Sequence, residues 1–281
     1  MAMNRDLVGK KSDPLTFGYG WKDAILYALS VGAKEDELDF TVELRGPKVL
    51  PTFAVVPSFQ ALVQVVGNLN LSNPLKALHG EQKIILHRPL PAQATLTTVA
   101  EIKGIYDKGK GALVVVEAKT RDEKNVPVFD NVFSVFCLGE GGFGGDKSPE
   151  TSPPEPPAGK APDFQVTEAT TREQALLYRL NGDFNPLHAE PQMAKMVGYD
   201  RPILHGLCTF GFAGRAVLKA ACGSDVKRLK SFGARFAKPV FPGDTLTTEG
   251  WLVSPGTFAV RVVRQDGTAV LTNGVAEVTP A

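Results

Sequence analysis

The chain has 281 residues, enough for one large domain or two of ordinary size with a substantial buried core. Its formal net charge is +1 and no long run of lysine and arginine occurs, so the sequence argues against a nucleic-acid partner and favours a small ligand. Three cysteines without paired spacing indicate a reducing compartment, and no signal core or membrane-spanning apolar run is present, so we expect a cytoplasmic protein without a membrane partner.

The first 140 residues predict one long helix and several antiparallel strands. Residues 21–31 have the pattern of an amphipathic helix that Gly32 would end, and residues 51–56 are expected to be extended. Pro57 suits the first turn of a helix over residues 58–69. Because this helix is apolar almost all round, we expect it to be buried with a sheet wrapped about it. Strands are expected over residues 83–87, 95–105, 112–120 and 126–138, with a loop at 79–80 and a turn at 107–111.

The composition changes abruptly between residues 139 and 162. A glycine-rich run gives way to a proline-rich segment that is too poor in apolar side chains to fold alone. We therefore expect a linker at residues 141–162, between an N-terminal unit (1–140) and a C-terminal unit (163–281). The glycine-rich part contains Phe143, which a pure spacer would not need, so a long active-site loop is the alternative there.

The second unit repeats the first at an almost constant offset. The hexapeptide from Ala175 to Leu180 matches the one from Ala24 to Leu29, 151 residues earlier, and the segment that starts at Lys238 matches the one that starts at Arg88, 150 residues earlier. Two matches at nearly one offset indicate a tandem duplication. We call residues 1–140 the first copy and residues 163–281 the second copy, each predicted to be a helix wrapped by an antiparallel sheet.

A dense polar cluster occurs in the second copy alone. A helix is expected over residues 170–180, with a threonine cap at its start, and Gly182 would end it. Asp183, Asn185 and His188 follow around Pro186, which cannot continue a helix interior, so a tight turn is predicted. Such a turn can aim Asp183 and His188 at one point, as the activation of water by an acid and a base requires.

Ordinary turn chemistry is the alternative to a functional site here, because Asp, Asn and Gly are common turn residues. The first copy argues against it, since the same position there reads Ser30-Val31-Gly32-Ala33 and lacks the cluster. A metal site is a weaker alternative, because Asp183 and His188 have no second histidine or acidic cluster at ligand spacing nearby. We therefore expect a catalytic site without a metal.

Gly206 is expected at the start of the second copy's long apolar helix, residues 207–222. The first backbone N–H groups of a helix have no intrahelical partner and carry the positive end of its dipole, so they can hold an oxyanion. A neutral helix start is an equally good interpretation of Gly206 alone. His205 is interpreted as a capping or packing residue.

The motifs together resemble a known family. The stretch from Tyr178 to His188, the His205-Gly206 pair, Phe236 and the Pro-Gly-Asp at residues 242–244 closely resemble the MaoC-like hydratase 2 group. These are (R)-specific 2-enoyl-CoA hydratases of double hot-dog fold, and the sequence is most similar to the hydratase unit of peroxisomal multifunctional enzymes of type 2. The similarity runs almost from end to end, and it implies an α+β fold with two tandem hot-dog units.

The resemblance also implies roles for individual residues. Asp183 and His188 would bind and activate water, Asn185 would orient the site, and the amide of Gly206 would form the oxyanion hole. No cofactor is implied, and no dinucleotide fingerprint follows a predicted strand. Contacts with the acyl-CoA substrate would come from His79, Gly80, Lys108 and Phe236. From residue type alone, Lys108 is more simply a turn lysine.

The implied reaction adds water to a trans-2-enoyl-CoA to give (3R)-3-hydroxyacyl-CoA in β-oxidation or related acyl-CoA metabolism. A hot-dog acyl-CoA thioesterase is the enzymatic alternative, and a non-catalytic acyl-CoA-binding module is the other. A homodimer is expected by resemblance, as is a peroxisomal location if the chain is excised from a larger eukaryotic enzyme. The sequence leaves open which of Asp183 and His188 delivers the proton, and also the chain-length preference.

The first copy is expected to make room for the acyl chain, because a hot-dog helix normally presses against its sheet. Small residues near its long helix support this hypothesis: Ala54, Ala61, Gly67 and Ala77. On this interpretation, Ala61→Phe would fill the acyl space. A purely structural role for the first copy is the alternative.

Overall fold

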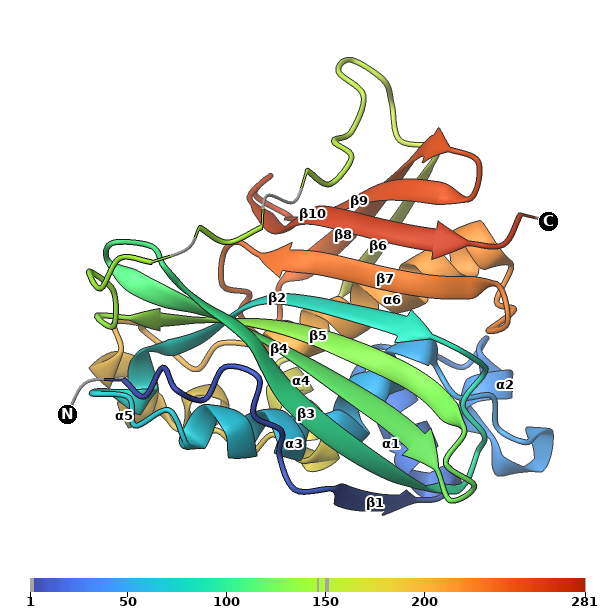
Figure 1. Cartoon of the computed structure of the whole chain (residues 1–281). Helices are drawn as coiled ribbons and strands as arrows, with labels where there is room; N and C mark the ends of the chain where they lie inside the picture. The colour runs from blue at the N-terminus through green and yellow to red at the C-terminus, as the bar shows by residue number, and fades with distance from the viewer. Residues whose placement is uncertain (1–2, 146, 150–151, 281) are drawn as a thin grey trace.

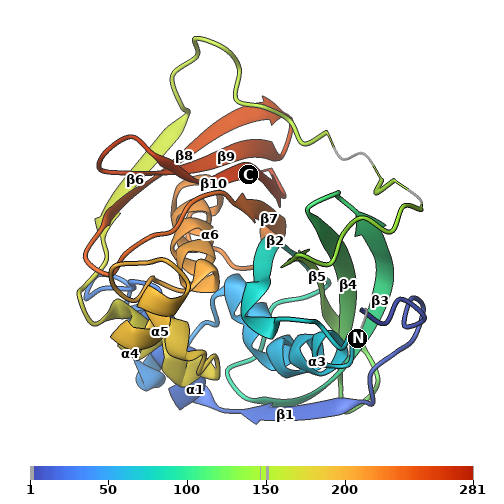
Figure 2. The same ribbon diagram turned by 90° about the vertical axis from the view of Figure 1, so that its left-hand side faces the viewer.

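The computed structural model describes residues 3–145, 147–149 and 152–280, and its centre is one curved sheet. Ten antiparallel strands pair in the order β1-β3-β4-β5-β2-β7-β10-β9-β8-β6. The sheet curves over two central helices, and the shorter helices lie on the far side of these (Figures 1 and 2). This is the α+β arrangement predicted from the sequence.

Within the described residues, each copy contributes five strands and three α-helices. The first copy holds β1 (Leu15–Tyr19), α1 (Trp21–Ser30), α2 (Leu38–Thr41), α3 (Val55–Gly67), β2 (Ala77–Leu86), β3 (Ala94–Asp107), β4 (Gly111–Asp122) and β5 (Pro127–Leu138). The second holds β6 (Phe164–Ala169), α4 (Gln174–Tyr178), α5 (Pro191–Met196), α6 (Gly206–Cys222), β7 (Leu229–Phe236), β8 (Thr245–Ser254), β9 (Thr257–Arg264) and β10 (Ala269–Val278).

The two copies join through β2 and β7. These strands pair antiparallel with Ile84 opposite Phe232, and both side chains are buried, so a single sheet runs through the whole chain. Equivalent residues of the two copies, in and just after α1 and α4, also meet. The rings of Tyr27 and Tyr178 lie 6.2 Å apart, and the Asn181 amide donates to the Ser30 hydroxyl at 2.9 Å. Both pairs are separated by 151 residues, the offset of the repeat.

The central helices differ in burial. Every residue of α6 from Leu207 to Leu218 is buried, as expected for a helix wrapped by a sheet. In α3, Ala61 and Val65 pack on the sheet, but Val63 is 48% exposed and Gln60 is exposed as well. The prediction that α3 is buried all round is therefore wrong, because its apolar residues on one face line a cavity.

Three local predictions need correction. Residues 51–54 form a 3₁₀ helix that leads into α3 instead of an extended segment, since Pro51 suits a first helical turn. His79 and Gly80 lie within β2, with a register irregularity between His79 and Glu81, instead of in a loop. The helix expected from residue 170 begins at Gln174, because the Thr170 hydroxyl bonds the Asp244 carbonyl instead of capping the helix.

The start of the predicted linker is anchored to the first copy. The Asp107 carboxylate accepts the backbone N–H groups of Gly142 and Gly144 at 2.9 and 2.5 Å, and Phe143 packs against the first-copy core. The glycine-rich segment is therefore held in place and is not a simple spacer. Across the described residues, no helix combines the length and the apolarity needed to span a membrane.

Candidate active site

The predicted turn follows α4. A short 3₁₀ helix ends at Asn181, and Gly182 adopts a φ of +109°, a conformation that residues with a Cβ rarely reach. The Asp183 carboxylate accepts the N–H of Asn185 at 3.2 Å, and the Asn185 side chain accepts the N–H of Leu187 at 3.1 Å. Asn185 thereby caps the 3₁₀ helix Pro186–His188 and fixes the direction in which His188 leaves the turn.

Asp183 and His188 converge, as the turn predicts. One carboxylate oxygen of Asp183 and one ring nitrogen of His188 lie within 4.8 Å of each other, a separation that a bridging water can span. The Nδ1 of His188 lies 2.9 Å from the Ile203 carbonyl, which can only accept a hydrogen bond. Nδ1 therefore carries the hydrogen in neutral His188, and Nε2 presents a lone pair.

The environment of this pair favours its uncharged form. Burial raises the pKa of Asp183 and lowers the pKa of His188, and the attraction between the two opposes both shifts. Because the groups are coupled, their protons belong to the pair. Burial thus brings the proton affinities of the carboxyl and the imidazole closer together than they are in water.

His205 is the site residue that sequence reasoning missed. Its ring stacks on His188 with 3.8 Å between centroids and 27° between planes, and only 1% of the residue is exposed. It comes from the segment before α6, 17 residues after His188, so local spacing could not place the two together. The available signal was that the histidine directly precedes Gly206.

The three side chains Asp183, His188 and His205 form a group with ligand atoms within 4.8 Å of one another. The sequence-based argument that no second histidine lies nearby is therefore wrong, because His205 is distant in the chain but adjacent to Asp183 and His188 in the fold. The hydrogen bond from His205 Nε2 to the Asp183 carbonyl leaves only Nδ1 for a metal, and that atom is buried. The donor set consequently fits an acid–base pair better than a metal site.

Gly206 is the first residue of α6, as predicted, and it lines the same cavity. The N–H of Cys208 bonds the His205 carbonyl at 3.1 Å, so the pairing of the helix backbone begins two residues after Gly206. A Cβ on Gly206 would lie 3.1 Å from the ring of Phe236. The position therefore favours glycine where backbone and ligand must approach closely.

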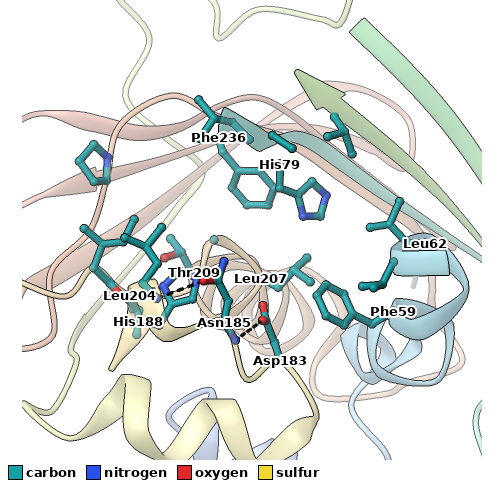
Figure 3. Close-up of a pocket in the computed structure, with 18 of the residues that line it drawn as sticks. Phe59, Leu62, His79, Asp183, Asn185, His188, Leu204, Leu207, Thr209 and Phe236 are labelled. Atoms are coloured by element: carbon teal, nitrogen blue, oxygen red, sulfur yellow. Dashed lines mark hydrogen bonds between the residues drawn. The ribbon is translucent and has the colours of Figure 1, made fainter. Parts of the chain in front are cut away.

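The opposite wall carries two of the four expected substrate contacts. His79 and Phe236 line the cavity and face the turn from Gly182 to His188, with 4.9 Å between their rings (Figure 3). We call this turn the catalytic turn, for the role proposed below. Burial lowers the pKa of His79 to about 4, so its ring is neutral. Gly80 is the next residue of β2 and lies against the Ser134 carbonyl. Lys108 is in the β3–β4 turn, where its ammonium bonds the Ser148 hydroxyl at 2.5 Å, so the structure does not bring it to the cavity wall.

The cavity has a volume of about 770 Å³ and is lined mainly by apolar side chains. The catalytic turn and α6 form one wall, and α3 forms another through Phe59, Leu62, Val63 and Val66. Of the four small residues expected near the acyl chain, Gly67 and Ala77 line this cavity, whereas Ala54 and Ala61 are buried in the core. The cavity thus runs from a polar acid–base pair to an apolar surface of the first copy (Figure 3).

Both copies match known families. The MFE-2 hydratase 2 N-terminal domain matches residues 17–139, and the MaoC-like domain matches residues 154–278. A probable enoyl-CoA hydratase 2 from Dictyostelium discoideum is 40% identical over 98% of this chain and 96% of its own length. A solved MaoC-like dehydratase from Phytophthora capsici is 33% identical, with a TM-score of 0.89 over 99% of this chain and 98% of that one.

The two family models together cover both copies, and they define the chain as a MaoC-like protein with two hot-dog units. A Mycobacterium tuberculosis protein described as a double hotdog has the same fold, with a TM-score of 0.62 over 96% of this chain and 95% of that one, at 14% identity. From the full-length similarity at 40% identity, the chain belongs to the hydratase 2 family of MaoC-like proteins.

Proposed function

We propose that the protein is an (R)-specific enoyl-CoA hydratase that adds water to a trans-2-enoyl-CoA. The observation that carries the proposal is the placement of Asp183 and His188 within 4.8 Å of each other at the end of an apolar cavity, beside the N-terminus of α6. Hydration needs a base for water, a proton for C2 and a stabiliser for the enolate oxygen. These three requirements correspond to the pair and the Gly206 amide.

In the proposed reaction, a water molecule bridges Asp183 and His188 and loses one proton to the pair as its oxygen bonds to C3. The π electrons of the C2–C3 bond move to the thioester oxygen, which the backbone N–H of Gly206 stabilises. The pair then holds one extra proton and delivers it to C2 as the carbonyl re-forms. Water is consumed and the pair returns to its starting charge, so the reaction needs no redox cofactor, and none is proposed.

Asn185 has a positioning role in this proposal, because its side chain holds the Leu187 amide and so fixes the turn between the two catalytic residues. His79 and Phe236 would pack against the substrate from the opposite wall. The acyl chain would run under α3 toward Gly67 and Ala77. Lys108 is proposed only as a contact with the charged part of CoA outside the cavity, since its present partner is Ser148.

Hydration of crotonyl-CoA tests the proposal against its two alternatives. Loss of the enoyl-thioester absorbance without release of thiol indicates hydration, and chiral chromatography of the product should give the 3R isomer. Thiol release would instead identify a thioesterase. An unchanged spectrum, with crotonyl-CoA bound by calorimetry, would identify a binding module and contradict the proposal.

We also propose a homodimer, but one that forms through a surface other than the sheet edge expected for hot-dog units. Hot-dog units commonly pair their sheets, and here the pairing of β2 with β7 already does so within one chain. Apolar side chains on α1 and α4, including Trp21 and Leu176, are 40% and 52% exposed and offer another surface. Light scattering tests this proposal, and a monomer mass at micromolar concentration would contradict it.

Localisation to the cytoplasm or to peroxisomes is likewise a proposal, to be tested by imaging.

A further inference from the structure

We infer that His205 is a positioning residue for hydration, which holds the Asp183 main chain and the His188 ring in their working arrangement. The inference depends on the function proposed above and deepens it. Its evidence is independent of Asp183–His188 proximity, because it concerns what surrounds the pair. Sequence reasoning assigned His205 only to packing or capping.

His205 contacts both members of the pair. Its Nε2 lies 3.2 Å from the Asp183 carbonyl, and its ring stacks on His188 at 3.8 Å. The ring of Tyr178 also packs against it, with 5.0 Å between centroids. One buried ring therefore fixes the start of the catalytic turn and the plane of the imidazole at its end.

The hydrogen bonds define the tautomer of His205. A carbonyl oxygen can only accept, so Nε2 carries the hydrogen and Nδ1 has the lone pair. Within the described part of the chain, Nδ1 is buried and has no hydrogen-bond partner. A proton on Nδ1 would place an unpaired charge in the interior, next to His188.

His205 accordingly stays neutral. Burial, and then the charge that His188 would carry, lower the pKa of His205 to about 2, and the nearby Arg179 acts in the same direction. The titratable groups that face His188 are the Asp183 carboxyl and the His205 ring. His205 therefore presents an uncharged π face to His188.

This arrangement separates positioning from catalysis. One nitrogen of His205 is occupied by the Asp183 carbonyl and the other is buried, so neither faces a substrate. The π face can still stabilise the His188 imidazolium that forms when water gives up its proton. His205 thus acts through the geometry of the turn and through the stack.

Two substitutions distinguish these contributions in the full-length protein with crotonyl-CoA. His205→Phe keeps an aromatic face but removes the donor to Asp183, whereas His205→Leu removes both. We expect each to lower kcat by about ten- to a hundredfold, with KM within about twofold of wild type, because the acid–base pair is displaced. His205→Leu should also move the low-pH limb of kcat/KM down by about half a pH unit, while His205→Phe leaves it in place.

Phe210→Leu is the matched control. Phe210 lies in α6, the helix that begins directly after His205, is fully buried and stacks on Phe232 at 4.6 Å, away from the cavity lining. It should lower thermal stability and leave kcat and the pH profile unchanged. An equal loss of kcat and an equal pH shift in this control would mean that His205 acts only through helix stability, which overturns the inference.

Should the apolar variants fail to fold, His205→Gln keeps an amide donor and removes the stack. The expected result is then the pH shift with a smaller loss of kcat. Wild-type kcat and pH profile in any folded His205 variant would contradict the inference. Wild-type activity is measured first, because its absence would reject the hydratase proposal itself and not the role of His205.

Discussion

The turns after α1 and α4 are equivalent positions of the repeat with opposite surroundings. Each turn contains a glycine of positive φ, +86° at Gly32 and +109° at Gly182. The first turn packs against α6: Phe212 occupies the space beside Gly32, and the Arg215 Nε donates to the Val31 carbonyl at 3.0 Å. The second turn faces the cavity beneath α3.

The first turn forms an interface with α6, and the second turn forms an interface with α3 across the cavity. These two interfaces differ in charge as well as in packing. Arg215 is 2% exposed and forms ion pairs with Glu37 of the first copy and Glu168 of β6. The first interface is thus filled by the Phe212 ring and by the buried guanidinium of Arg215, which is paired with carboxylates. The second interface is hollow and is lined by Asp183 and His188. The two turns are counterparts in the repeat, and under the proposed function the packed interface would serve stability while the hollow one would hold the substrate.

The largest expected effect comes from the catalytic turn. Asp183→Asn and His188→Ala should each lower kcat by about two to four orders of magnitude, because each removes one half of the proton-transfer pair. The double variant should lose much less than the product of the two single losses, since the residues act as a unit. Steady-state hydration of crotonyl-CoA provides the measurement, with circular dichroism as the control for folding. Near-wild-type turnover in a folded single variant would remove the pair from the mechanism.

The filled interface should respond in stability instead of chemistry. Arg215→Met leaves the buried Glu37 and the partly buried Glu168 without their partner, and removing one member of a buried ion pair costs about 3–5 kcal/mol. Urea denaturation should show this loss, and kcat of the protein that remains folded should stay within about twofold of wild type. A large loss of kcat without a loss of stability would mean that the two interfaces are not separate in function.

Gly206→Ala tests how closely the substrate approaches the helix N-terminus. The added Cβ would lie 3.1 Å from the Phe236 ring, so that ring must shift by a few tenths of an ångström. We expect kcat to fall about tenfold while the oxyanion amide is retained. The double variant with Phe236→Leu relieves this contact, and its activity is compared with that of Phe236→Leu alone, because Phe236 is itself a proposed substrate contact. If activity does not recover there, the Cβ obstructs the thioester itself, and if Gly206→Ala has no effect, the amide is not close to the reacting atoms.

The sequence predicted the parts of this comparison that depend on local chemistry. Glycine and proline defined the turn around Asp183, and the repeat offset identified the first copy as a counterpart without the cluster. Tertiary packing decided the rest. Neither the stack of His205 on His188 nor the Arg215 ion pairs could be inferred, because each joins segments whose separation in the chain carries no periodic signal. The apolar pattern of α3 was misinterpreted as complete burial, since a helix that lines an apolar cavity has the same pattern as one in a core.

A bulky side chain placed in the cavity from α3 of the first copy should change substrate preference. Gly67 lies at the end of α3 and lines the cavity, and a Cβ there would meet open space, so Gly67→Phe extends into the acyl region without a backbone clash. We expect kcat/KM for decenoyl-CoA to fall about tenfold more than for crotonyl-CoA. Gly18→Phe, at an open position of β1 outside the cavity lining, is the control. Equal losses on both substrates would mean that the first copy does not hold the acyl chain, and Ala61→Phe cannot replace this test because Ala61 is in the core.

The smallest expected effect is a dependence of stability on pH that originates in the first copy. Burial lowers the pKa of His79 to about 4, below the ordinary value of 6.5 that it has in the unfolded chain. As the pH falls below 6.5, the unfolded chain therefore binds a proton that the native protein does not. The free energy of unfolding is consequently highest above pH 6.5 and decreases progressively towards pH 4.

His79→Phe should reduce the proton uptake on unfolding by up to one proton between pH 6.5 and pH 4, as measured by urea denaturation at several pH values. Phe133→Leu removes a neighbouring ring 5.7 Å away without removing a titrating group, so it should lower stability by a similar amount at each pH. An unchanged slope in His79→Phe would mean that His79 is protonated as readily in the folded protein as in the unfolded chain, and a neutral ring could then no longer be assigned to the wall opposite the catalytic turn.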